Sequence, residues 1–134
     1  MKTPKEMNEL ELYFVIDYCG GFIWRMNHDM CDGRIPEKDW PAIDKDIEEM
    51  KKLQKEAVAE LPRIGVNNPL NADGKPTDTY WTWYRTWDQW KKDLSDEKWN
   101  KINHDSTHGF TDEDVARYKS EAFNPNPPLV GLSF

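Results

Sequence analysis

The residues that could perform chemistry in this chain are its three histidines and the aspartates beside them. The tripeptide Asn-His-Asp occurs twice, at 27–29 and at 103–105. His104 and His108 are four residues apart, the spacing at which a helix places two ligands on one face. If the two segments meet, His and Asp side chains would hold a divalent metal ion that activates water for hydrolysis. The ligands of such a hydrolase would be His28, Asp29, His104, Asp105 and His108.

The same residues also support a simpler interpretation without a metal. Their spacing matches neither the H-E-x-x-H motif nor a zinc-finger ladder. Gly109 and the helix-start signal Phe110–Thr111 indicate a turn at 104–108, which would separate the two histidines. Aspartates in such segments commonly form side-chain turns and helix caps. We therefore expect a protein without a cofactor and favour a role other than catalysis, and keep a divalent metal as the alternative.

The segment 78–94, DTYWTWYRTWDQWKKDL, contains four of the chain's seven tryptophans. On a helical wheel its apolar side chains form one continuous sector, and its polar side chains lie opposite. A single sector is typical of a helix that faces a core, and a ligand platform would not need six aligned members. The predicted core residues of this helix are Tyr80, Trp83, Tyr84, Trp87, Trp90 and Leu94.

Trp81 lies outside that sector, on a face that it shares with three charged residues. Arg85 follows it by four positions and could stack on its indole ring. An exposed tryptophan beside an arginine is typical of an interaction hot spot. The predicted partner-binding residues are therefore Trp81, Arg85, Asp88 and Lys92. The alternative is that a neighbouring segment, such as the C-terminal tail, covers Trp81.

A helix over 4–19 is the first element expected to position these residues. Thr3 can cap it and Glu6 can close a capping box, while the two glycines at 20–21 would end it. Asp17 would lie inside its apolar half and pair with Arg25 or a lysine. The alternative is a short β-hairpin near residues 12–26, in which LYFVIDY and FIWRM are joined by the glycines.

The rest of the chain predicts helices separated by polar loops. Residues 25–41 show no hydrophobic period and predict a long loop, whereas residues 42–61 carry an amphipathic helix that Pro62 ends. A second long loop at 62–78 precedes the aromatic helix. Two more helices are expected, one that carries Trp99 and Ile102 and one over 110–123.

These elements predict a mainly α fold, a compact single-domain bundle of four to five helices with two long polar loops. The helical domain would cover residues 1–124, and residues 125–134 would form an extended, Pro-rich apolar tail. A length of 134 residues without an internal repeat fits one domain. Two cysteines do not form a disulfide framework, and the first residues do not resemble a signal peptide, so we expect a cytoplasmic protein.

Composition indicates the kind of partner. The net charge of −7 disfavours direct binding to nucleic acid or to an anionic membrane, and favours a basic protein as the partner. We therefore expect a small acidic protein-binding module, for example a phage or bacterial inhibitor or immunity-type protein that blocks a basic, nucleic-acid-handling partner. The alternatives are the metal-dependent hydrolase described above and a structural component of a phage or other assembly. The sequence does not indicate an oligomeric state.

Overall fold

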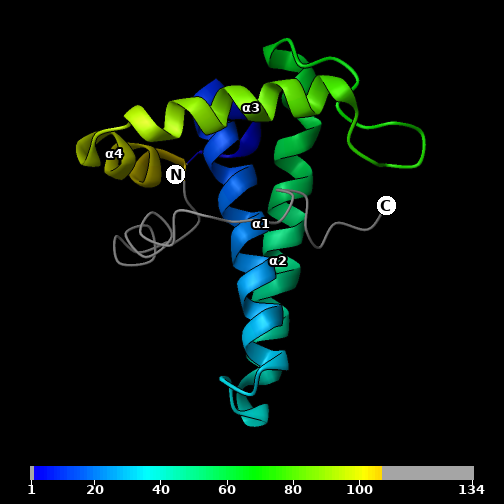
Figure 1. Ribbon diagram of the computed structural model, residues 1–134, viewed down its shortest axis with the longest axis vertical. Helices are drawn as coiled ribbons and strands as arrows, with labels where there is room; N and C mark the ends of the chain where they lie inside the picture. The colour runs from blue at the N-terminus through cyan, green and yellow to red at the C-terminus, as the bar shows by residue number, and fades with distance from the viewer. Residues whose placement is uncertain (1, 107–134) are drawn as a thin grey trace.

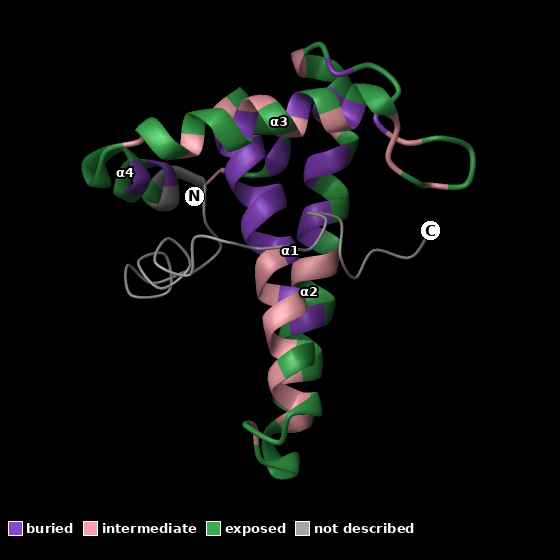
Figure 2. Cartoon of the chain, viewed as in Figure 1, coloured by how far each residue is buried: buried purple, intermediate pink, exposed green. Residues whose placement is uncertain are grey.

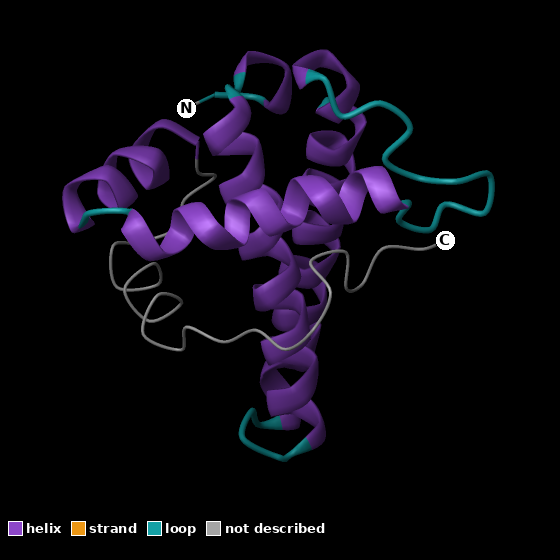
Figure 3. Ribbon diagram, turned by 45° about the horizontal axis from the view of Figure 1, so that its top comes forward, coloured by secondary structure: helices purple, strands orange, loops and turns teal. Residues whose placement is uncertain are grey.

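The computed structural model describes residues 2–106, and its elements are helical (Figure 1). Two long antiparallel helices form a hairpin, and a third helix lies across one end of it (Figures 1 and 3). A shorter fourth helix contacts the first helix at the same end. The helices are α1 (Glu9–Cys31), α2 (Trp40–Ala59), α3 (Asp78–Asp93) and α4 (Asp96–Ser106). No strand occurs among the described residues, and the predicted mainly α class is confirmed.

The molecule has two parts that differ in packing. We call the end where α3 and α4 pack the head (residues 2–19 and 51–106), and the opposite end of the α1–α2 pair the hairpin end (residues 20–50). The sulfur atoms of Cys19 and Met50, 3.9 Å apart, mark the boundary between them. Buried residues concentrate in the head, as Figure 2 shows, and only three residues of the hairpin end are buried. The described structure is therefore a packed head from which a two-helix hairpin projects.

The start of α1 differs from the prediction. The helix begins at Glu9, after Asn8, and the capping box joins Asn8 to Glu11 instead of Thr3 to Glu6. Pro4–Glu6 forms a separate 3-10 turn, η1, and the Thr3 hydroxyl donates only to the Glu6 carboxylate, at 3.0 Å. The chain is extended at Met7, which places that side chain in the core with 1% exposure. With Met7 buried, the helix starts five residues later than predicted.

The two glycines of α1 do not end it, so both the predicted stop and the alternative β-hairpin are wrong. The helix continues through Gly20 and Gly21 to Cys31. Each glycine in a helix interior costs about 0.5–1 kcal/mol relative to alanine. Beyond them Ile23 is fully buried and Phe22 packs against the core. Burying one such side chain contributes about 1.5–3 kcal/mol, which is enough to carry the helix past the glycines.

The longer α1 shortens the first predicted loop. Residues 25–31 are helical, and only residues 32–39 connect α1 to α2, with the 3-10 turn η2 (Glu37–Asp39) among them. Gly33 has a φ of 73°, in the left-handed region, and reverses the chain after the helix. The Trp40 indole donates to the Ile35 carbonyl at 3.0 Å and closes the turn. Helix α2 then begins two residues earlier than predicted.

The second predicted loop is confirmed in its position. After α2 comes the 3-10 turn η3 (Leu61–Ile64), and residues 65–77 then lead to α3 without further helix. The Asn71 side chain accepts from the backbone N–H groups of Asp73 and Lys75, at 2.9 and 3.0 Å. Thr77 caps α3 by accepting from the N–H of Tyr80. Local side-chain hydrogen bonds thus give this loop a defined conformation.

Tyr13 of α1 is the centre of the contact between α1 and α3. Its ring stacks on Trp83 at 4.0 Å and on Trp87 at 5.6 Å between ring centroids. Trp99 of α4 meets Trp87 and Phe14 edge-on, at 5.9 and 5.6 Å. The core prediction is thereby confirmed for Trp83, Trp87 and Tyr80, all of which are buried.

The aromatic prediction fails at Trp90, which is 40% exposed. Helix α3 extends sideways past α1 (Figure 1), and near its C-terminal end the described elements cover its apolar face only in part. Tyr84 and Leu94 are half-buried and pack against the core. Trp81, assigned to the outer face, is also half-buried and meets Tyr80 and Tyr84 edge-on.

Helix α4 confirms the predicted short helix, because Trp99 and Ile102 are both buried. The predicted helix over 110–123 and the tail at 125–134 lie outside the described residues. None of the helices that the structure describes has the length and apolar character needed to cross a membrane.

Candidate functional site

Asp17 is the most deeply buried charged residue described in the chain, with 1% exposure. It lies in the middle of α1 and accepts hydrogen bonds from three side chains of α3. The Tyr84 hydroxyl donates at 3.1 Å, the Trp87 indole at 2.9 Å and the Lys91 ammonium at 3.2 Å. The prediction that Asp17 pairs with Arg25 or a lysine is therefore confirmed for Lys91.

The hydrogen bonds around Asp17 have a structural role. Burial, and then the nearby Asp17 carboxylate, raise the pKa of Tyr84 well above its usual value, and Tyr80 beside it shifts in the same direction for the same reasons. Both phenols therefore stay neutral near pH 7. Asp17 has no face open to a substrate, and its donors come from three successive turns of one helix. The cluster fixes where α3 crosses α1.

The predicted partner-binding residues lie on one helix of the head. Arg85, Asp88 and Lys92 are exposed, whereas Trp81 is half-buried against neighbouring rings. Asp88 pairs with Lys91 at 3.4 Å. These residues share the outer face of α3, as the sequence predicted, but the indole that would anchor a partner there leans toward the core. Their role in binding stays a prediction.

The structure does not bring the histidines together. His28 lies near the end of α1, at the hairpin end, and its Nδ1 is 3.3 Å from Asp32 and 3.9 Å from Asp29. His104 is exposed on α4, in the head, at the other end of the molecule (Figure 1). Asp105 lies on α4 as well, and His108 lies outside the described residues. Within the described chain, no group of three His, Cys, Asp or Glu side chains could hold a metal.

The hairpin end carries most of the acidic surplus of the chain. It has eight Asp and Glu residues against four Lys and Arg residues, a net charge of −4, whereas the head has 13 against 12, a net charge of −1. Seven of the eight carboxylates are exposed, and Asp29 is half-buried. Five of the exposed carboxylates have no ion pair with a described residue: Glu37, Asp39, Asp44, Asp46 and Glu49. The sequence analysis did not predict this surface, because it assigned residues 25–41 to a loop and not in part to α1.

The hairpin end also carries half-buried apolar side chains. Trp24 and Trp40 are half-buried at the hairpin end, as are Met26 and Met30. The Trp24 ring stacks on His28 at 5.0 Å. No third helix of the described chain lies beside this part of the hairpin (Figures 1 and 3). The hairpin end thus presents half-exposed rings within a negatively charged surface.

Protein-family models, curated proteins and solved structures were compared with the chain, and none matches it significantly.

Proposed function

We propose that this protein is a small acidic binding module that docks the hairpin end of α1 and α2 on a basic protein. The observation that carries the proposal is the uneven distribution of charge, with −4 on the projecting hairpin end and −1 on the larger head. A concentrated charge of one sign on a projecting element attracts a partner of opposite sign and orients the encounter.

The unpaired carboxylates are the second support. An Asp or Glu that already has an intramolecular partner must lose it before it binds another cation. Asp44, Asp46 and Glu49 need no such exchange, because none has an ion pair with a described residue. They lie in the first half of α2, beside α1 but away from α3 and α4.

The half-buried rings supply the apolar part of such an interface. Charged rims set the rate and orientation of association, whereas aromatic side chains in the centre provide most of the affinity. Trp24 and Trp40 are half-buried rings of the same hairpin end as the carboxylates. Basic proteins with an exposed cationic surface are often those that handle nucleic acids, so a module of this kind would act as an inhibitor by covering that surface.

The test is a pair of charge variants with the same net charge. The hairpin-end variant carries Glu37→Gln, Asp44→Asn, Asp46→Asn and Glu49→Gln, and the head control carries Glu56→Gln, Asp73→Asn, Asp93→Asn and Glu97→Gln. All eight residues are exposed. Both variants and the native chain serve as baits in host lysate, at low and at high salt, with captured proteins quantified by mass spectrometry.

We expect a basic protein that the native chain and the head control retain at low salt, and that the hairpin-end variant loses. High salt should weaken this capture, because screening acts on exposed charges. Equal loss with both variants would show that net charge alone is responsible. A partner held equally by all three baits would place the binding surface elsewhere, and either result would contradict the proposal.

A further inference from the structure

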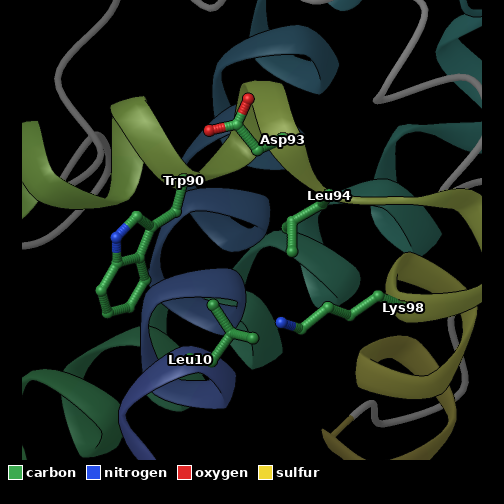
Figure 4. Close-up of a pocket in the computed structure, with 5 residues that line it drawn as sticks. All are labelled: Leu10, Trp90, Asp93, Leu94 and Lys98. Carbon is green, nitrogen blue, oxygen red and sulfur yellow. The ribbon is translucent and has the colours of Figure 1, made fainter.

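A pocket opens in the head where α1, α3 and α4 meet (Figure 4). Its volume is about 270 Å³. The side chains that line it are Leu10, Trp90, Asp93, Leu94 and Lys98. The pocket lies far from the hairpin end, so a ligand here would be independent of the proposed docking surface.

Trp90 forms an apolar wall of this pocket. It is the one large hydrophobic residue that is exposed among those described, at 40%. Its ring is nevertheless held, because it meets Tyr13 edge-on at 5.5 Å, and Tyr13 is itself stacked on Trp83. A ring that is already fixed loses little conformational entropy when a ligand stacks on it. Leu10 and Leu94 extend the apolar lining and are half-buried.

Lys98 adds a positive charge to the apolar lining. Its ammonium reaches into the space between Leu10 and Leu94, while the Asp93 carboxylate points away from it (Figure 4). Lys98 forms no ion pair with a described residue, in contrast to Lys91, which pairs with Asp17 and Asp88. Asp93 is the carboxylate of the same lining, and it forms no ion pair with Lys98.

We propose that this pocket binds a small aromatic carboxylate, with its ring on Trp90 and its carboxylate on the Lys98 ammonium. The apolar wall selects the ring, and the unpaired cation selects the anion over a neutral analogue. Ligand pockets for drug-sized molecules span roughly 300–1,000 Å³. The smaller volume here fits a single ring with a short acidic arm.

The experiment is a titration of the full chain followed by ¹H–¹⁵N spectra, which resolve the indole N–H groups. The probes are phenylacetate, its neutral analogue phenylacetamide, and acetate, which lacks the ring. Trp90→Phe identifies the Trp90 signal by its loss. We expect phenylacetate to shift that signal and to bind at least about threefold more tightly than phenylacetamide, the range of an exposed ion pair. Acetate should leave the signal unchanged.

Two matched variants test the role of the ammonium. Lys98→Gln should reduce the affinity for phenylacetate to that for phenylacetamide, whereas Lys52→Gln, which removes an exposed lysine outside the pocket, should leave the affinity unchanged. Equal binding of acid and amide to the native chain would identify a purely apolar contact and overturn the proposal. So would an unchanged affinity in Lys98→Gln, or the absence of any shift at Trp90. None of these outcomes depends on whether the hairpin end binds a basic protein.

Discussion

The head and the hairpin end are built from the same two helices but are held together by different means. In the head, α1 and α2 are covered by α3 and α4, and α1 is buried without interruption from Glu11 to Gly20. At the hairpin end the two helices have only each other, and Ile23 and Ile47 are the buried side chains. The head therefore has a core formed by four helices, whereas the hairpin end has only the contact between α1 and α2. Because little of its surface is used for packing, the hairpin end is where a binding surface costs the fold least.

Removing one tryptophan ring should destabilise the head much more than the hairpin end. Trp87→Ala should destabilise the protein by about 3–5 kcal/mol, because it removes a fully buried side chain from the centre of the aromatic cluster. Trp24→Ala, at the half-buried hairpin end, should cost about 1–2 kcal/mol. Urea unfolding followed by circular dichroism measures both. Equal losses would mean that the hairpin end is as tightly packed as the head.

The next prediction concerns the buried Asp17 and its hydrogen-bond donors on α3. Asp17→Asn should cost about 1–3 kcal/mol, because Lys91 loses its buried partner and the donors of α3 face a weaker acceptor. Asp88→Asn is the matched control, since Asp88 is the exposed carboxylate that pairs with the same lysine. That change should stay within about 0.5 kcal/mol. If urea unfolding gives the same loss for both, Asp17 does not fix the α1–α3 crossing.

Alkaline pH should act on the head through its buried tyrosines. Burial raises the pKa of Tyr13, Tyr80 and Tyr84 above the ordinary value of 10.0. A raised folded-state pKa means that the unfolded chain releases its proton first, so stability is complete below pH 10 and falls as the pH rises above it. Tyr80, the most deeply buried of the three, should contribute a loss of about 1.4 kcal/mol by pH 11, and the half-buried Tyr84 a smaller loss.

Tyr84→Phe isolates the contribution of one phenol. The stability of this variant, measured by urea unfolding from pH 8 to 11, should fall less steeply above pH 10 than that of the native chain. The hydrogen bond to Asp17 is lost at every pH, so the comparison uses the slope and not the absolute stability. An unchanged slope would show that Tyr84 ionises as readily in the folded protein as in the unfolded chain.

The last comparison is between one glycine at the hairpin end and one glycine in the head. Gly33 at the hairpin end and Gly65 in the head have φ values of 73° and 92°, and an added Cβ would meet nothing within 4 Å at either. Alanine at each position should therefore cost about 1–2 kcal/mol from backbone strain alone. If the molecule unfolds as one unit, the two losses are equal in urea.

Amide hydrogen exchange sharpens this last comparison. If the hairpin end opens separately, Gly33→Ala should accelerate exchange within residues 20–50 while the global stability changes little, and Gly65→Ala should lower the global stability. If Gly33→Ala and Gly65→Ala have equal effects on global stability and on all protected amides, the hairpin end and the head unfold together. That result would remove the energetic distinction between the two parts.

Much of the fold could be predicted where local signals agree with the core. The aromatic helix was predicted over 78–94 and spans Asp78–Asp93, and Trp99 and Ile102 are buried on the short helix after it. The predictions fail where a tertiary contact outweighs a local signal. The glycines of α1 are strong local stop signals, but α2 packs beside them and the helix continues. The capping box moved from Thr3 to Asn8 because Met7 is buried.

The candidate sites were less predictable than the fold. Helical periodicity cannot show where a helix runs past its neighbour, so Trp90 was assigned to the core although α3 leaves it exposed. The paired Asn-His-Asp tripeptides suggested one site, but the described histidines His28 and His104 lie at opposite ends of the molecule. The acidic hairpin end could have been found from the net charge of residues 20–50. These charges form one surface only because the residues fold into one hairpin.

Residue types and their spacing along the chain were enough to predict helices, an aromatic core and surplus negative charge. These properties follow from residue type and period, which act over one or two turns of chain. The tertiary structure alone decided which part of each helix is covered, because coverage depends on where α3 crosses the α1–α2 pair. That crossing is set by contacts between residues about 70 positions apart, such as Asp17 with Trp87. Separations of this length leave no periodic trace in the sequence.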